Sequence, residues 1–360
     1  MTPGPLGPLG DRVPEALRGA SAYHVPQPPQ IRAKLDANEL PFAWPAELRR
    51  RLGAALAEVA LERYPDPRAK VLRDLIAGQY AIRGDQLVFG NGSDELIAML
   101  CAAFAGPVLY PVPTFVYYKL AAVARGVPAI EVPLGPRFEL DEAALERAIG
   151  EHHPSVVFLA LPNNPTGTLW RMELACELAA RHRDTVIVSD EAYAAYSGAT
   201  NLPALAAHPN LVVMRTLSKV GLAGLRVGFT ISAPAIAEVL DKVRPPYNLS
   251  SLDQAAAVFA LREAGPWCLA RAADVVTERS ALVAALGQLR CEVFASEANL
   301  VLVRFGAGRA AQLWQGLADR GIVVRNFDHP GGGPLAGCLR ITVGTPAENA
   351  LLIEALGELA

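Results

Sequence analysis

Lys219 stands in a stretch of sequence that combines a primary amine with hydroxyl and guanidinium groups. The stretch, Arg-Thr-Leu-Ser-Lys-Val-Gly-Leu-Ala-Gly-Leu-Arg (215–226), follows an apolar, strand-like segment. Thr216 and Ser218 precede the lysine, and Arg226 follows a glycine-containing turn. A lysine at a strand end could hold an aldehyde cofactor as a Schiff base, while the hydroxyl and guanidinium groups bind a phosphate. Most lysines are solvated surface charges, so this interpretation depends on the other motifs in the sequence.

Two further motifs follow apolar, strand-like segments. Pro162-Asn-Asn-Pro-Thr-Gly167 is first of all a turn sequence, but Asn164 could also direct its amide at a ring oxygen of a cofactor. Asp190-Glu-Ala-Tyr193 places a carboxylate at a strand end, where it could keep a pyridine nitrogen protonated. Tyr193 could offer its phenol to the ring oxygen. The alternative for Asp190 is an ordinary cap of the next helix.

Glycines and arginines supply candidate anion sites. Gly90-Asn-Gly-Ser-Asp94 leads from a strand-like segment into a helix, where free backbone N–H groups could cradle a phosphate. The alternative is a plain loop in which Ser93 or Asp94 caps the helix. The motif is not a GxGxxG fingerprint, so it gives little support to nicotinamide binding. Arg340 and Arg325 lie in or beside apolar strands, where each should meet a carboxylate of the protein or of a substrate.

The elements that must position these residues alternate along the chain. Apolar strand candidates alternate with helical stretches such as 94–105 and 172–183, and they are 87–89, 108–110, 130–133, 156–161, 185–189, 211–215 and 227–231. This pattern predicts an α/β fold with a mostly parallel sheet covered on both faces. Ligands of such sheets bind at the carboxyl ends of the strands, which is where the motifs lie.

The pattern changes after about residue 245. Two helices (about 251–264 and 267–290) precede strand candidates at 291–295, 299–305, 322–325 and 338–343. The last helix should start at Thr345 as N-cap, with Pro346 in the first turn and Glu348 closing a capping box. We therefore predict an irregular N-terminal arm (1–45) that packs on the small domain or a partner subunit. A large α/β domain (46–245) and a small α+β domain (246–360) follow.

Composition excludes several classes of protein. The chain has 360 residues, 52% of them hydrophobic, and a net charge of −3, so it carries no basic footprint for nucleic acid or an acidic membrane. We find no apolar run of the ~18 residues that span a membrane and no signal-peptide pattern. The five cysteines are scattered without metal-ligand spacing and are expected to be buried, reduced thiols. A cytoplasmic enzyme without a metal is the expectation.

Taken together, the motifs resemble the class II, fold-type I pyridoxal-phosphate-dependent aminotransferases, and more narrowly the histidinol-phosphate aminotransferase family. The resemblance runs from about Leu35 to the C-terminus. The segments that carry it are Leu35-Asp-Ala-Asn-Glu-Leu-Pro41, Arg63-Tyr-Pro-Asp-Pro67, Gly90-Asn-Gly-Ser-Asp-Glu-Leu96, Pro113-Thr-Phe115, Arg215-Thr-Leu-Ser-Lys219, Arg244-Pro-Pro-Tyr-Asn248 and Leu339-Arg-Ile-Thr-Val-Gly-Thr345.

The resemblance implies a role for each site residue. Lys219 is the Schiff-base lysine and proton carrier, Asp190 pairs with the pyridinium nitrogen, and Phe115 stacks on the cofactor ring. Tyr193 and Asn164 bind the ring oxygen. The phosphate is held by groups that include hydroxyls, backbone N–H groups and a guanidinium, from Ser93, Asp94, Thr216, Ser218 and Arg226. One departure is that the turn 220–225 is a residue shorter than in many relatives.

The resemblance also implies substrates and a partner. Arg340 would bind the carboxylate of glutamate or 2-oxoglutarate, and Arg325 the phosphate of histidinol phosphate, with Asn38 and Tyr64 also in the substrate site. Tyr64 would reach the cofactor phosphate of a neighbouring subunit, which implies a homodimer with shared active sites.

The implied reaction transfers the amino group of L-histidinol phosphate to 2-oxoglutarate in a ping-pong sequence and serves histidine biosynthesis. Two alternatives share the fold: a phosphothreonine decarboxylase and a broad aromatic or aspartate aminotransferase. A regulator that only senses pyridoxal phosphate is a remote alternative, because the sequence lacks a DNA-binding domain and a basic patch.

Overall fold

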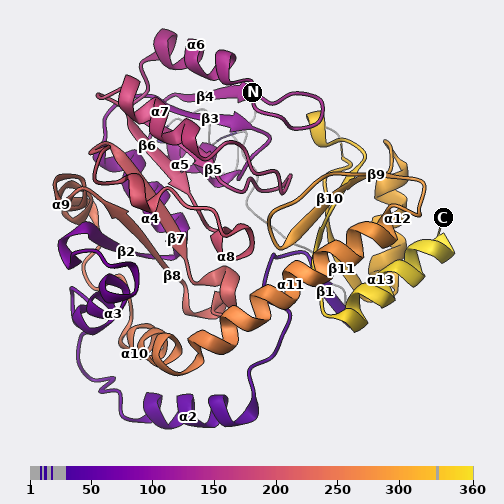
Figure 1. Ribbon diagram of the computed structural model, residues 1–360, viewed down its shortest axis with the longest axis horizontal. Coiled ribbons are helices and arrows are strands. Elements are labelled where there is room, and N and C mark those ends of the chain that lie inside the picture. The colour runs from indigo at the N-terminus through magenta and orange to yellow at the C-terminus, as the bar shows by residue number, and fades with distance from the viewer. Residues whose placement is uncertain (1–8, 10–11, 14–17, 19–29, 330–331, 360) are drawn as a thin grey trace.

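The computed structural model describes residues 9, 12–13, 18, 30–329 and 332–359, and these build two β-sheets (Figure 1). The larger sheet has seven strands in the order β2-β8-β7-β6-β5-β3-β4. Its strands are β2 (Leu87–Asn91), β3 (Val108–Val112), β4 (Ala129–Pro133), β5 (Val156–Ala160), β6 (Val186–Asp190), β7 (Leu211–Thr216) and β8 (Val227–Ser232). Only β8 runs antiparallel to its neighbours. The prediction of a mostly parallel sheet is therefore confirmed.

Both faces of this sheet are buried, as its continuous apolar strands predict. Along β5, Val156 and Phe158 join the core on one face, whereas Val157 and Leu159 join the core on the other. One face is covered by α4 (Gly92–Ala103), α5 (Tyr117–Ala124) and α9 (Pro234–Val243). The opposite face is covered by α3 (Lys70–Tyr80), α6 (Glu142–His152), α7 (Glu173–Arg181) and α10 (Ser251–Phe259).

The second sheet has five strands in the order β1-β11-β12-β10-β9. They are β1 (Ala33–Leu35), β9 (Glu292–Val293), β10 (Leu300–Arg304), β11 (Ile322–Asn326) and β12 (Cys338–Thr342). Residues of α11 (Gly265–Leu286), α12 (Arg309–Asp319) and α13 (Pro346–Leu359) share its core. In Figure 1, α11 runs from beside the larger sheet to the second sheet.

The N-terminal segment contributes to this second sheet. Residues 33–35 lie inside the segment predicted to be irregular, yet they form β1, which pairs in parallel with β11. The pairing fixes the residues just after β1 between the two sheets, beside the cavity described below. Most of the predicted arm before residue 30 lies outside the described residues, and the domain boundaries at 45 and 245 stay predictions.

Two helix predictions have different outcomes. The break expected near residue 265 is absent, because α10 continues through a π-helical turn (Ala260–Ala264) into α11, which ends at Leu286. The π-helical turn lets the helix continue past Pro266, which has no N–H to donate to a preceding carbonyl oxygen. The capping box of α13 is confirmed: the Thr345 N–H donates to Glu348 Oε2 (2.9 Å), and the Glu348 N–H donates to Thr345 Oγ1 (3.3 Å).

Two helices lie apart from these layers. The short α8 (Ala194–Ser197) follows β6, and α2 (Ala46–Ala57) packs against α10 at the lower edge of Figure 1. No residue of α2 is buried in the chain described.

The cysteines agree with the prediction in part. All five are free thiols, but Cys176 and Cys291 are only half-buried rather than buried. Within the described residues, no cluster of side chains has the composition of a metal site. No helix in the same part of the chain combines the length and the apolar character of a membrane span.

Candidate active site

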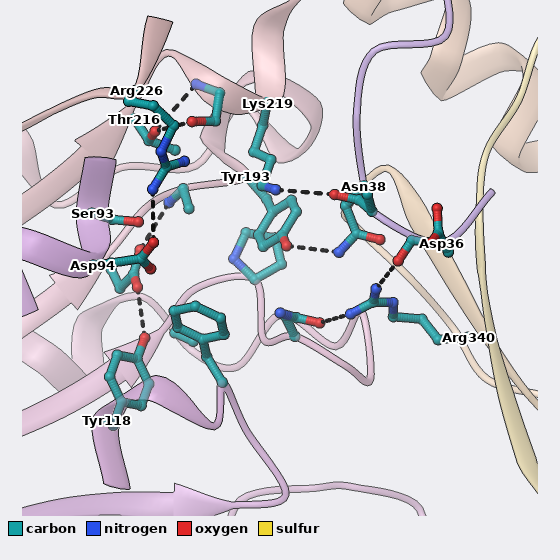
Figure 2. A pocket seen from close by; sticks show the side chains of 18 residues that line it. Asp36, Asn38, Ser93, Asp94, Tyr118, Tyr193, Thr216, Lys219, Arg226 and Arg340 are labelled. Carbon is teal, nitrogen blue, oxygen red and sulfur yellow. Dashed lines mark hydrogen bonds and ion pairs between the residues drawn. The ribbon is translucent and has the colours of Figure 1, made fainter. Parts of the chain in front are cut away.

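A cavity of about 200 Å³ lies at the carboxyl ends of β5, β6 and β7, between the two sheets (Figure 2). It gathers residues from segments far apart in the sequence, and all the predicted site residues line it except Tyr64 and Arg325. Those that do are Asn38, Ser93, Asp94, Phe115, Asn164, Asp190, Tyr193, Thr216, Ser218, Lys219, Arg226 and Arg340.

Lys219 follows β7 in a short 3-10 turn (Ser218–Val220), which directs its side chain into the cavity. Nζ donates to the carbonyl oxygen of Ala37 (3.3 Å) and lies 5.9 Å from the centre of the Tyr193 ring. Burial, with a smaller contribution from the charge of Arg340, lowers the pKa of Lys219 to about 8. An amine with this pKa is partly neutral near pH 7 and able to act as a nucleophile or a base.

Asp190 is the last residue of β6, and both its carboxylate oxygens accept hydrogen bonds. The Tyr118 hydroxyl donates to Oδ2 (2.6 Å), and the Ala192 N–H donates to Oδ1 (3.1 Å). Burial raises the pKa of Asp190 to about 6, while these two bonds oppose the shift, so the group is mostly ionised at pH 7. The alternative that Asp190 caps the next helix is wrong, because Tyr193 is the N-cap of α8.

Tyr193 is fixed by the N-terminal segment. Its hydroxyl oxygen accepts a hydrogen bond from Asn38 Nδ2 (2.9 Å), which leaves the phenolic proton to donate elsewhere. Burial raises the pKa of Tyr193, so it stays a neutral phenol. Asn38 itself has a left-handed backbone (φ 55°) and bonds Thr342 Oγ1 through both its N–H (2.9 Å) and its Oδ1 (3.0 Å). The pairing of β1 with the second sheet therefore positions the phenol.

Arg340 lies in β12 and faces the cavity from the second sheet. Nη1 donates to Asn164 Oδ1 (2.7 Å), and Nη2 donates to the carbonyl oxygen of Asp36. Both of these acceptors are uncharged groups. Because Oδ1 of Asn164 is engaged with Arg340, its Nδ2 is the group that remains to donate toward the cavity.

Two glycines shape one end of the cavity. The helix α4 begins at Gly92, and a Cβ there would lie 2.3 Å from Nη2 of Arg226. Gly92 also has a φ of +78°, which L side chains rarely adopt. A Cβ at Gly228 would lie 2.8 Å from the backbone nitrogen of Ser93. Glycine at both positions lets the N-terminus of α4, β8 and Arg226 approach closely.

This close approach creates a cradle of hydrogen-bond donors. Arg226 reaches it through its shortened turn and pairs with Asp94 (Nη2–Oδ2, 2.7 Å). Thr216 Oγ1 donates to Ser218 Oγ at 2.9 Å, and both hydroxyls line the cavity. A helix N-terminus with a guanidinium and two hydroxyls has the donors that a phosphate needs. The alternative of Ser93 or Asp94 as the helix cap is wrong, since Asn91 is the N-cap of α4.

Two predicted site residues lie outside the cavity. Tyr64 is 81% exposed and stacks on Tyr247, with ring centres 4.6 Å apart. Arg325 is half-buried in β11, directly opposite Arg340 in the strand pairing.

Sequence reasoning missed residues that the structure adds to the cavity. Asp36 and Ala37 accept hydrogen bonds from Arg340 and Lys219 through their backbone carbonyl oxygens, which no pattern of side chains predicts. Tyr118 contacts Asp190 and lies edge-on to Phe115 (5.8 Å, 88°). Its only signal is the spacing of three residues from Phe115 across the start of α5.

Comparisons with known proteins agree with this geometry. The family "Aminotransferase class I and II" matches residues 31–356. The chain is 43% identical over 332 residues to the histidinol-phosphate aminotransferase of Polaromonas naphthalenivorans, covering 90% of this chain and 89% of the relative. It is 41% identical over 369 residues to that of Acidovorax sp., covering 99% and 98%. The crystal structure of histidinol-phosphate aminotransferase from Sinorhizobium meliloti in complex with pyridoxal-5'-phosphate is also similar (TM-score 0.82, 28% identity), covering 92% and 91%.

Proposed function

This chain belongs to the histidinol-phosphate aminotransferase family within the class I and II aminotransferases, and we propose that it transfers the amino group of L-histidinol phosphate to 2-oxoglutarate. The products are imidazole acetol phosphate and glutamate. The observation that carries the proposal is the buried amine of Lys219, held with a lowered pKa in one cavity with Asp190 and Tyr193. The free thiols fit a cytoplasmic enzyme.

The residues of the cavity fit pyridoxal phosphate. Lys219 would bind its aldehyde, Asp190 would face its ring nitrogen, and Phe115 would lie against its ring. Tyr193 and Asn164 each keep a donor for the ring oxygen. The close approach that Gly92 and Gly228 allow brings the N-terminus of α4 beside Arg226, and these groups would hold the phosphate together with Ser93, Thr216 and Ser218, which line the same cavity. When bound, the cofactor stores the electron pair released at the substrate Cα.

The chain's own groups handle the proton. Lys219 Nζ takes the Cα proton of the amino substrate and later returns a proton, so it must be neutral when it acts as a base. A pKa of about 8 raises the neutral fraction at pH 7 to about one-tenth, roughly 300-fold above that of a solvated lysine. Desolvation by the closed cavity and the nearby Arg340 charge are what keep Lys219 in this state.

Two arginines would recognise the substrates. Arg340 would exchange its bonds to Asn164 and to the Asp36 carbonyl for bonds to the carboxylate of glutamate or 2-oxoglutarate, which is a stronger acceptor than either. Arg325, beside it in the sheet, would bind the phosphate of histidinol phosphate.

The active protein would be a homodimer. Leu61 (70% exposed) and Tyr64 (81% exposed) are large apolar or aromatic side chains that stay mostly exposed in the described part of the chain, although Tyr64 stacks on Tyr247, and they follow α2, which has no buried residue there. A second copy would cover this face and receive Tyr64 at its cofactor phosphate. Sedimentation velocity of the purified protein tests this: a monomer at micromolar concentration would refute it.

A single-turnover absorbance experiment tests the reaction. L-Histidinol phosphate added to the purified protein with bound pyridoxal phosphate should convert the cofactor absorbance rapidly, and 2-oxoglutarate should restore it. Phenylalanine and threonine phosphate should act much more slowly. Carbon dioxide release from threonine phosphate would instead indicate the decarboxylase, and fast turnover of phenylalanine or aspartate a broad aminotransferase. A protein that takes up no pyridoxal phosphate would overturn the proposal altogether.

A further inference from the structure

We propose that Tyr118 is a positioning residue that acts through Asp190, holding the carboxylate in the orientation and ionised state needed to pair with the cofactor ring nitrogen. The inference rests on the proposed function, since it concerns the same cavity. It assigns a role to a side chain that lines the cavity but is itself fully buried.

The geometry of the carboxylate is the first support. Asp190 has two oxygen atoms, and each accepts one bond from the protein: Oδ2 from the Tyr118 hydroxyl (2.6 Å) and Oδ1 from the Ala192 N–H (3.1 Å). The Ala192 bond comes from the chain two residues away and moves with Asp190. The Tyr118 bond comes from a different element, α5, so among the described residues it is the bond that ties the carboxylate to a distant part of the sequence.

The phenol is itself held rigidly. Tyr118 is fully buried, and its ring stacks on Phe158 of β5 (4.6 Å between centres, 8° between planes). Phe115, which lines the cavity, lies edge-on to the same ring (5.8 Å, 88°). One tyrosine thus contacts both the carboxylate that would pair with the ring nitrogen and the aromatic side chain that would lie against the ring.

The charges around Asp190 show why such support matters. Burial and the nearby carboxylates of Glu191 and Asp94 all favour the protonated acid, and the hydrogen bonds from Tyr118 and Ala192 are what oppose them. Burial also raises the pKa of Tyr118 well above its ordinary value, so its hydroxyl remains a donor. Without it, Asp190 would keep one local bond and a larger protonated fraction at pH 7.

The test compares two cofactors on one protein. The cofactor-free protein is titrated with pyridoxal phosphate and with its analogue that has carbon in place of the ring nitrogen, and the ratio of the two Kd values is taken. Because only pyridoxal phosphate has the nitrogen, the ratio isolates the contribution of Asp190. Tyr118→Phe should lower the preference for pyridoxal phosphate about tenfold, as expected for a lost hydrogen bond to a charged group. The ratio is insensitive to the fraction of folded protein in a preparation.

Two variants make the result specific. Tyr110→Phe removes the hydroxyl of another buried tyrosine of the same cluster (ring centres 5.9 Å apart), which lies beside Glu131, and should leave the ratio unchanged. Adding Tyr118→Phe to Asp190→Asn should also leave it unchanged. Equal weakening of both cofactors by Tyr118→Phe would reduce Tyr118 to a packing residue and overturn the inference. Failure of the unaltered protein to bind pyridoxal phosphate would instead refute the proposed function.

Discussion

Replacing Lys219 by methionine should stabilise the cofactor-free protein at pH 7 and destabilise it above pH 10.5. The reason is the pKa of Lys219, which burial lowers from 10.5 to about 8. Between these values the unfolded chain binds the proton and the folded chain does not, so folding stability rises with pH through this window. Below pH 8 the folded protein carries the full cost of a buried ammonium, about 3 kcal/mol for a shift of this size.

Methionine keeps most of the apolar stem of lysine but removes the charge and the bond from Nζ to the Ala37 carbonyl. That bond contributes about 1 kcal/mol in either protonation state. The variant should therefore be more stable by about 2 kcal/mol at pH 7 and less stable by about 1 kcal/mol above pH 10.5.

Urea unfolding of the cofactor-free protein and the variant, at equal protein concentration from pH 6 to pH 11, measures this difference. Other titrating groups cancel because they are common to both proteins. Lys242→Met, at a lysine whose side chain is 64% exposed, should show no such change of sign. A difference that stays constant across pH 8 to 10.5 would refute the lowered pKa, and with it the account of Lys219 as a base.

Three further predictions concern other parts of the site. Asp190→Asn should retain pyridoxal phosphate but lower kcat about 100-fold or more in steady-state assays, because an amide cannot stabilise the protonated ring nitrogen. Gly92→Ala should weaken cofactor binding about tenfold in an absorbance titration, since its Cβ would lie 2.3 Å from Nη2 of Arg226 and displace it. Glu191→Gln should lower the free energy of urea unfolding by about 3 kcal/mol, because it leaves Arg215 (16% exposed) without its fully buried partner.

Matched changes elsewhere should have small effects. Gly150→Ala lies in α6 with nothing within 4 Å and should leave cofactor affinity unchanged. Glu47→Gln removes a surface ion pair with Arg50 and should alter the free energy of unfolding by less than about 1 kcal/mol. Effects of Gly92→Ala or Glu191→Gln no larger than these controls would contradict the corresponding argument. An unchanged kcat of Asp190→Asn would contradict the role of Asp190 in stabilising the protonated ring nitrogen.

The large sheet could be predicted from the sequence because both of its faces are buried. Short, continuous apolar runs such as 156–161, alternating with helical stretches, favour the middle of a covered parallel sheet. The motifs at the ends of those runs then had to meet at one edge, as Lys219, Asp190 and Asn164 do. Local chemistry was equally informative at Thr345 and Glu348, whose capping box forms as expected.

Other features depend on contacts that no local pattern encodes. The strand β1 is only three residues long and forms because β11 offers it an edge, so its own sequence gave no strand signal. Asp36 and Ala37 enter the cavity through backbone carbonyls, which every residue has. Tyr118 is a buried tyrosine like many others until the fold brings it to Asp190.

Burial disfavours the charged forms of both Lys219 and Asp190, and it therefore shifts their pKa values in opposite directions. Burial lowers the pKa of Lys219 and raises that of Asp190. A direct ion pair between them would return both groups toward ordinary pKa values and fill the space between them. Instead, Lys219 donates to the Ala37 carbonyl, and Asp190 accepts from Tyr118 and Ala192, all uncharged partners on the cavity wall. These neutral partners position each group but do not neutralise its charge. A ligand with an electrophilic carbon at one end, for the amine, and a basic nitrogen at the other, for the carboxylate, would pair with both groups.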